Sequence, residues 1–75
     1  MNYVFVLVAK EREIDAPQII LTAVDSSDLQ PMYELCETYA STDLDLLCKT
    51  FHNGELIEIS IWDESIEDFS KLVEF

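Results

Sequence analysis

Residues 44–62 read LDLLCKTFHNGELIEISIW and carry the clearest structural signal in the chain. Asn53 and Gly54 separate two apolar-rich runs, and both residues tolerate the positive φ angles that a type I′ turn requires. A two-residue loop between alternating runs is the usual form of a tight β-hairpin. The sequence therefore predicts a hairpin centred on residues 53–54.

This turn fixes the register of the two strands. It places Lys49 opposite Glu58, an opposite-charge pair that favours the hairpin by roughly 0.2–1 kcal/mol. Alternate residues of both runs then share one face, which we expect to be the core face: Leu44, Leu46, Cys48, Thr50, Ile57, Ile59 and Ile61. The reverse face carries Leu47, Phe51, Leu56 and Trp62 and is more apolar than contact with water requires, so it is an interface candidate.

The remaining elements follow from periodicity. Residues 2–10 and 18–24 are rich in β-branched and aromatic side chains and predict two strands, with Pro17 opening the second. Ser27 and Gln30 fit a capping box, so a helix is expected to begin there, with Pro31 in its first turn. Its apolar stripe comprises Leu29, Met32, Tyr33, Cys36, Tyr39 and Ala40.

A second helix is predicted near the end of the chain. Residues 63–65, Asp-Glu-Ser, resemble a helix cap, and a short apolar stripe of Ile66, Phe69, Leu72 and Val73 follows, ending at Phe75. The expected order is ββαββα in a single domain over residues 1–75. The expected fold is an α+β two-layer sandwich, in which a four-stranded, mainly antiparallel sheet carries both helices on one face.

The chain is strongly acidic. Sixteen Asp and Glu residues oppose four Lys and Arg residues, giving a formal net charge of −12 in 75 residues. Most of the imbalance lies after Val24, and such charge opposes compaction through self-repulsion. It also disfavours direct binding to nucleic acids or anionic membranes, which depends on basic residues. Basic proteins are the expected partners.

The cysteine and hydropathy patterns indicate the cellular compartment in which the protein is expected. Cys36 and Cys48 lack the spacing of a disulfide framework or a redox motif and are expected to be buried free thiols. No positively charged segment precedes residues 3–9, and no run approaches 18 apolar residues. We therefore expect a cytoplasmic protein, in the host cytoplasm if the protein is viral.

Catalytic and metal-binding patterns are weak. His52 is the sole histidine and is predicted beside the hairpin turn, whereas both cysteines are predicted to face inward, a poor arrangement for nucleophilic catalysis. A zinc site would need Cys36, Cys48, His52 and a carboxylate at irregular spacing. We expect no enzyme activity, no cofactor and no metal site.

The acidic surface is the remaining functional signal. We expect a small inhibitor that binds and blocks a basic, nucleic-acid-binding protein, either by mimicking nucleic acid or by binding elsewhere. Phage counter-defence, antitoxin and immunity proteins have this general character. The predicted contact residues are Glu34, Glu37, Asp43, Asp45, Glu55, Glu58, Asp63, Glu64, Glu67 and Asp68, with Phe51 and Trp62 as apolar anchors.

Two alternatives belong to other classes. In the first, the reverse face of the hairpin or the first strand forms a homodimer, and the charge serves only solubility. In the second, the chain is a small metal- or ligand-binding subunit, which predicts a ligand-induced rise in melting temperature.

Overall fold

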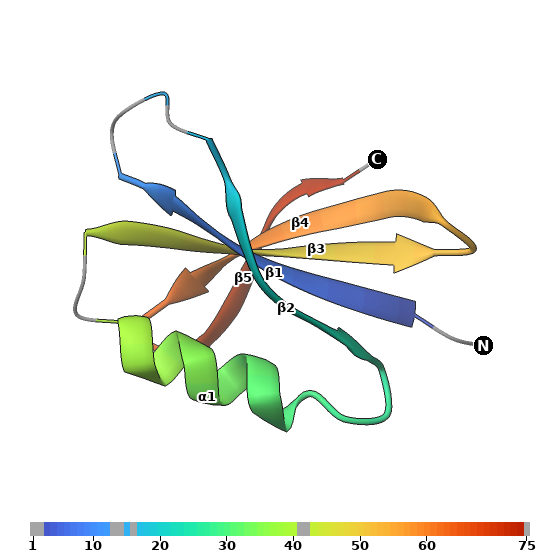
Figure 1. The fold of residues 1–75 in the computed structure, drawn as a ribbon, viewed down its shortest axis with the longest axis horizontal. Coiled ribbons are helices and arrows are strands. Elements are labelled where there is room, and N and C mark those ends of the chain that lie inside the picture. Colours follow the sequence, from blue (N-terminus) through green and yellow to red (C-terminus); the bar gives the residue numbers. More distant parts are fainter. Residues whose placement is uncertain (1–2, 13–14, 16, 41–42, 75) are drawn as a thin grey trace.

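The computed structural model describes residues 3–12, 15, 17–40 and 43–74. The elements follow the order β1 (Tyr3–Glu11), β2 (Ile19–Asp25), α1 (Gln30–Tyr39), β3 (Leu44–His52), β4 (Glu55–Asp63) and β5 (Asp68–Glu74). The five strands form one antiparallel sheet in the order β2-β1-β3-β4-β5. Figure 1 shows the strands fanning out through their twist, with α1 against one side of the sheet.

The prediction of a four-stranded ββαββα sandwich with two helices is wrong. The segment predicted as the second helix is β5, which pairs with β4 and places Phe69 opposite Trp62. Asp63 Oδ1 accepts hydrogen bonds from Ser65 N (2.9 Å) and Ser65 Oγ (2.6 Å), so the expected cap is a turn between strands. The predicted ends of the first strand at Asn2 and of this helix at Phe75 lie outside the described residues.

The hairpin turn is confirmed, but the register beyond it is not. Asn53 (φ 52°) and Gly54 (φ 79°) both have positive φ, and Phe51 pairs with Leu56 as predicted. A β-bulge then shifts the pairing by one residue.

The shift moves β4 residues to new partners. Lys49 lies opposite Ile59 instead of Glu58, and Cys48 lies opposite Ser60. The isoleucines at 59 and 61 therefore lie on the face away from α1. Trp62 lies on the helix side instead, where its ring packs edge-on against Tyr33 and Phe69.

Replacing Gly54 with alanine is expected to lower the free energy of unfolding by about 1 kcal/mol, because φ of +79° suits glycine. An added Cβ would meet nothing within 4 Å, so the cost is confined to the backbone. Urea denaturation measures it. Asn53→Gly, which keeps a turn of the same type, should change stability by less. An equal loss in both variants would contradict a type I′ turn.

The helix begins later than predicted. Its N-cap is Leu29, which makes no side-chain cap, and the nearby Asp28 Oδ1 accepts from Gln30 N (3.3 Å). Ser27 N and Ser27 Oγ instead donate to Asp25 Oδ1, so the capping box is wrong. Pro31 lies in the first turn, as predicted.

The core lies between α1 and the sheet. Met32 and Cys36 of the helix are buried against Leu7 and Ala9 of β1 and Leu46 and Cys48 of β3. Both cysteines are confirmed as buried free thiols, and Cys48 Sγ lies 3.6 Å from Met32 Sδ. The apolar stripe of α1 is thereby accounted for as core packing.

Burial of the thiols predicts a loss of stability at alkaline pH. It raises the pKa of Cys36 to about 12 and that of Cys48 to about 11, from 9.0 for a thiol in water. The folded state holds these protons more tightly than the unfolded state does. The contribution of the protonated thiols to the free energy of unfolding is therefore complete below pH 9 and falls as pH rises toward 11–12. The slope should approach about 1.4 kcal/mol per pH unit for each thiol.

Urea denaturation between pH 8 and pH 11 tests this expectation. The double variant Cys36→Ala, Cys48→Ala should show a shallower decline, since only other groups then titrate. An unchanged decline in that variant would show that the thiols do not cause it.

The opposite face of the sheet carries no element of the described residues (Figure 1). We call this surface the open face. The register places on it side chains from four neighbouring strands: Val4, Val6, Val8, Ile20, Ala23, Leu47, Lys49, Phe51, Leu56, Ile59 and Ile61.

Candidate protein-binding site

Carboxylates gather at one end of the sheet. The antiparallel topology brings the end of β4, the start of β3 and the start of β5 together, and α1 ends close to the start of β3 (Figure 1). We call this region the acidic end; it comprises Glu37, Asp43, Asp45, Asp63, Glu64, Glu67 and Asp68.

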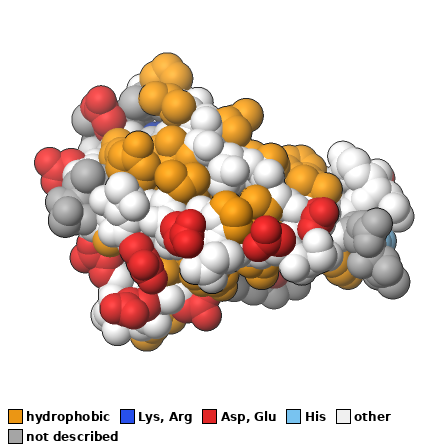
Figure 2. Space-filling view, turned by 60° about the horizontal axis from the view of Figure 1, so that its bottom comes forward, with side chains coloured by type: hydrophobic (Ala, Val, Ile, Leu, Met, Phe, Trp, Pro, Cys, Tyr) orange, Lys and Arg blue, Asp and Glu red, His pale blue; other side chains and the backbone are white. Residues whose placement is uncertain are grey.

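Most of these carboxylates are open to solvent. Asp45 and Asp63 are partly buried, and the other five are exposed. Figure 2 shows acidic side chains beside several apolar patches, with hardly any Lys or Arg surface in view. The acidic end therefore offers many unburied acceptors to a cationic partner.

Arg12 holds the start of β3 in place. Its guanidinium forms an ion pair with Asp45 (Nε to Oδ1, 3.2 Å) and donates to the carbonyl of Leu44 (3.2 Å). Its backbone N–H donates to the carbonyl of Asp43 (2.9 Å). Asp45 is thus partly neutralised from within the chain.

Hydrogen bonds at the turn between β4 and β5 hold the carboxylates of Asp63 and Asp68 in place. The hydrogen bonds from the Ser65 side chain and then its backbone lower the pKa of Asp63, so this group stays ionised in mildly acidic solution. Asp68 Oδ1 accepts from the Tyr33 hydroxyl (2.9 Å), which ties the start of β5 to α1. Burial, followed by the Asp68 carboxylate, raises the pKa of Tyr33, so the phenol remains a donor.

Glu67 has a strained backbone, with φ of 52° in a non-glycine residue. We expect Glu67→Gly to raise the free energy of unfolding by about 0.5–1 kcal/mol, because glycine adopts this conformation without the Cβ penalty. Urea denaturation measures the change. Glu64→Gly removes the same charge from the same turn at ordinary φ and should give no such gain. Equal gains in both variants would indicate charge relief instead of strain.

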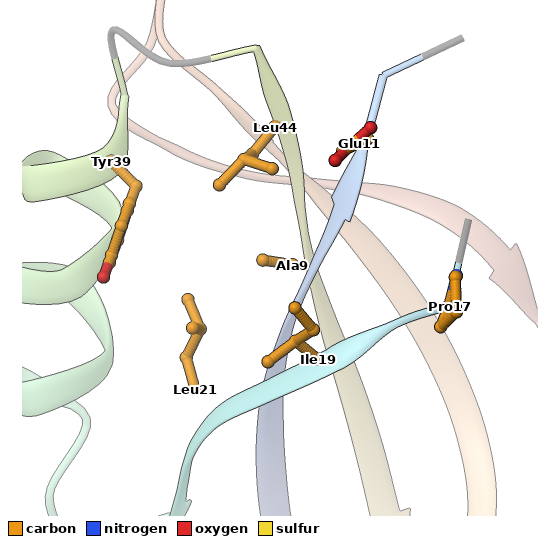
Figure 3. Close-up of a pocket in the computed structure, with 7 residues that line it drawn as sticks. All are labelled: Ala9, Glu11, Pro17, Ile19, Leu21, Tyr39 and Leu44. Carbon is orange, nitrogen blue, oxygen red and sulfur yellow. The ribbon is translucent and has the colours of Figure 1, made fainter. Parts of the chain in front are cut away.

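Two hollows flank the end of α1. One has a volume of about 440 Å³ and is lined mainly by apolar groups of Ala9, Pro17, Ile19, Leu21, Tyr39 and Leu44, together with Glu11. Figure 3 shows these side chains converging from α1 and the starts or ends of three strands. Ile19 is 64% exposed, so this apolar pocket is open to a partner.

The second hollow is acidic. It has a volume of about 270 Å³ and is lined by Glu37, Ala40, Trp62, Glu64 and Glu67. Tyr39 lines the apolar pocket and the next residue, Ala40, lines this one, so the two hollows adjoin at the end of α1. The acidic end thus places an apolar contact site and a cluster of carboxylates within reach of one partner.

The other predicted contact residues lie elsewhere. Glu34 is exposed on α1, one turn before the acidic end, while Glu55 is at the hairpin tip at the opposite end of the sheet. Glu58 is partly buried and accepts from Ser60 Oγ (3.3 Å). Phe51 lies on the open face, and Trp62 belongs to the ring cluster with Tyr33 and Phe69 while lining the acidic hollow.

Sequence reasoning missed the apolar pocket. Pro17, Ile19 and Leu21 belong to an uncharged run whose pattern predicts a strand. Side chains alternate between the two faces of a strand, so the adjacent Ile19 and Ile20 cannot both face the protein core. That pair was the available signal for an exposed apolar site.

The histidine and the two cysteines do not form a catalytic or metal-binding group. His52 stacks on Tyr3 near the hairpin turn, with ring centroids 4.8 Å apart. Burial keeps both thiols protonated at neutral pH, which makes them weak nucleophiles. Within the described ranges, no group of three or more His, Cys, Asp and Glu side chains is arranged to hold a metal ion.

Comparison with known proteins gives no family. The chain matches no protein-family model, no curated protein and no solved structure. The geometry of the chain itself therefore carries the functional argument. Among the described residues, no helix has the length and apolar character to cross a membrane.

Proposed function

We propose that this protein is a non-enzymatic, acidic binding protein that blocks the basic, nucleic-acid-binding surface of another cytoplasmic protein. The observation that supports the proposal most strongly is the acidic end, where seven carboxylates surround the turn between β4 and β5 and the end of α1. A partner surface that binds phosphates presents Lys and Arg, which are complementary to these carboxylates.

Electrostatics favours such a partner in two ways. Gathering like charges opposes folding of the isolated chain, and a cationic partner relieves this repulsion when it binds. The same charges attract a basic protein over distances of about 10 Å, and so accelerate the encounter. Both effects weaken as salt screens the charges.

The apolar pocket supplies the short-range part of the contact. Apolar side chains in the centre of an interface carry much of the binding energy, whereas charges at its rim mainly set specificity and rate. Ile19 and Tyr39 offer apolar surface, and Glu11 stands at the pocket beside them. The preferred partner segment therefore has an apolar side chain flanked by Lys or Arg.

Capture from a host extract at increasing salt tests the proposal. The captured protein should be basic and bind nucleic acid, and capture should weaken as salt rises. Addition of this protein should then release DNA or RNA from the purified partner in a mobility-shift assay. A captured protein that binds nucleic acid equally well with and without this chain would refute blocking.

A further inference from the structure

One edge of β2 pairs with no strand of the described chain, and we call it the outer edge. β2 ends the sheet in the order β2-β1-β3-β4-β5, so only its inner edge is bonded, to β1 (Figure 1). An edge strand presents a row of unpaired N–H and C=O groups, which natural sheets often protect with charged side chains or a bulge. Residues 16–24 include no charged residue, so the outer edge lacks the first kind of protection.

The hydrogen bonds of β1 show which peptide groups of β2 point outward. The Arg12 N–H donates to the carbonyl that precedes β3 (2.9 Å), so alternate residues counted back from it, including Val6 and Val8, bond to β3. The partners of these two valines on β2 are Ala23 and Ile20. The N–H and C=O groups of Ala23 and Ile20 therefore point away from β1, toward the outer edge.

The bulge in β2 leaves this outward row regular. Ile20 and Ala23 are three residues apart, but they lie opposite Val8 and Val6, which are two residues apart. The extra residue is absorbed by the bulge. The outward groups are thus about 6.8 Å apart, the spacing of alternate residues in a regular strand. An incoming extended segment can therefore bond to both Ile20 and Ala23.

Both sides of the outer edge are apolar. Ile19 lies on the helix side, where it lines the apolar pocket together with Pro17 and Leu21 (Figure 3). Ile20 lies on the open face, and the two isoleucines are 64% and 69% exposed. A segment that pairs with β2 therefore meets apolar surface on both of its faces, with the pocket on one of them.

Carboxylates flank this apolar edge at both ends. Glu11 lines the pocket, Asp15 precedes β2 and Asp25 ends it, and all three are exposed. Of the basic residues nearby, Arg12 is held in an ion pair with β3 and Lys10 donates to the carbonyl of Glu11. The complementary segment therefore has an apolar centre with Lys or Arg at both ends.

We propose that the outer edge of β2 pairs with an extended segment of the basic partner, which adds a sixth strand to the sheet and inserts an apolar side chain into the pocket. In strand addition, main-chain hydrogen bonds give affinity and pockets beside the edge give specificity. A second copy fits less well, because antiparallel pairing of two β2 edges brings Asp15 of one copy toward Asp25 of the other. The basic character of the partner rests on the proposed function, whereas the pairing of strands does not.

Amide hydrogen exchange of the purified chain, followed by NMR, tests the proposal. The probe is a blocked synthetic peptide of about eight residues, with Val in its centre and Lys at both ends. In the chain alone, the amides of Ile20 and Ala23 should exchange faster than that of Val24, which bonds to β1. Saturating peptide should slow the exchange of Ile20 and Ala23 by about tenfold or more, because exchange then requires the peptide to dissociate.

Proline substitutions test the role of the backbone. Ile20→Pro removes an outward N–H but no hydrogen bond to β1, so the fold should persist while peptide affinity falls by about tenfold or more. Ala23→Pro should act in the same way and replaces Ile20→Pro if circular dichroism shows that variant to be unfolded. Ile20→Val is the control, because it keeps the N–H and a β-branched side chain and should bind the peptide nearly as well as the original chain.

Three results would overturn the proposal. Exchange at Ile20 and Ala23 that is unchanged by about 1 mM peptide would show that β2 accepts no such strand. Equal protection by a peptide with Glu in place of Lys would show that charge does not select the segment. Protection that grows with protein concentration alone would identify a second copy as the occupant.

Failure of the strand pairing is distinguishable from failure of the proposed function. If the peptide gives no protection while a basic, nucleic-acid-binding protein is still captured and blocked, only the strand pairing is wrong. If no such protein is captured but the peptide still protects Ile20 and Ala23, the strand pairing holds and the proposed function is wrong.

Discussion

Replacing Trp62 with alanine is expected to lower the free energy of unfolding by about 3 kcal/mol, the lower end for a large aromatic core residue. Its ring lies 5.2 Å from Phe69 and 5.9 Å from Tyr33, and these two rings lie 5.8 Å apart. Each edge-on aromatic pair adds roughly 0.5–1.5 kcal/mol to the area buried. In a domain of this size, such a loss is a large share of the total stability.

Urea denaturation followed by circular dichroism measures the effect, because the variant lacks the tryptophan fluorophore. Trp62→Phe keeps a ring in the cluster and should cost less than half as much. Ile66→Ala, at an exposed side chain of the following turn, should be nearly neutral. If Trp62→Ala were also neutral, the ring cluster would not stabilise the fold, and Trp62 would be better explained as a contact for a partner.

Local signals in the sequence predicted the fold correctly where backbone chemistry decides it. Asn53-Gly54 specifies a turn through its φ angles, and the helix stripe containing Met32 and Cys36 is buried as predicted. These features depend on residues close together in the chain. Sequence reasoning therefore predicted the hairpin and α1 without knowledge of the tertiary structure.

Errors arose where distant contacts decide between local alternatives. Asp63 and Ser65 suit a helix cap and a turn equally well, and the pairing of β5 with the edge of β4 favours the turn. The bulge after Leu56 is another such case. It places the largest side chain of β4, Trp62, in the ring cluster on the helix side, a benefit that depends on Tyr33 and Phe69 from separate elements.

The candidate site also combines features that the sequence predicted with features that depend on the tertiary structure. A concentration of acids late in the chain was evident from the sequence, but only the topology brings Glu37 together with the β4–β5 turn and leaves Glu55 at the opposite end. The apolar pocket combines side chains from α1, β1, β2 and β3 or their flanks. Its position could not be inferred without the order of strands in the sheet.

Reversing one charge at the acidic end is expected to weaken binding to the captured basic partner by about tenfold or more. Glu64 is exposed and lines the acidic hollow, so Glu64→Lys would place a cation against the partner's cations as well as removing a carboxylate. The same change relieves repulsion among neighbouring acids, so stability should stay equal or rise slightly. Binding and stability should therefore move in opposite directions.

Glu55→Lys is the matched control, because it makes the same change in net charge at an exposed position beside the other turn. Isothermal titration at low and moderate salt should give a large loss of affinity for Glu64→Lys and a small one for Glu55→Lys. Equal losses would mean that the partner senses only the net charge of −12, and the acidic end would no longer qualify as a binding site. A loss confined to Glu64→Lys requires the carboxylates to act through their position, since both variants carry the same total charge.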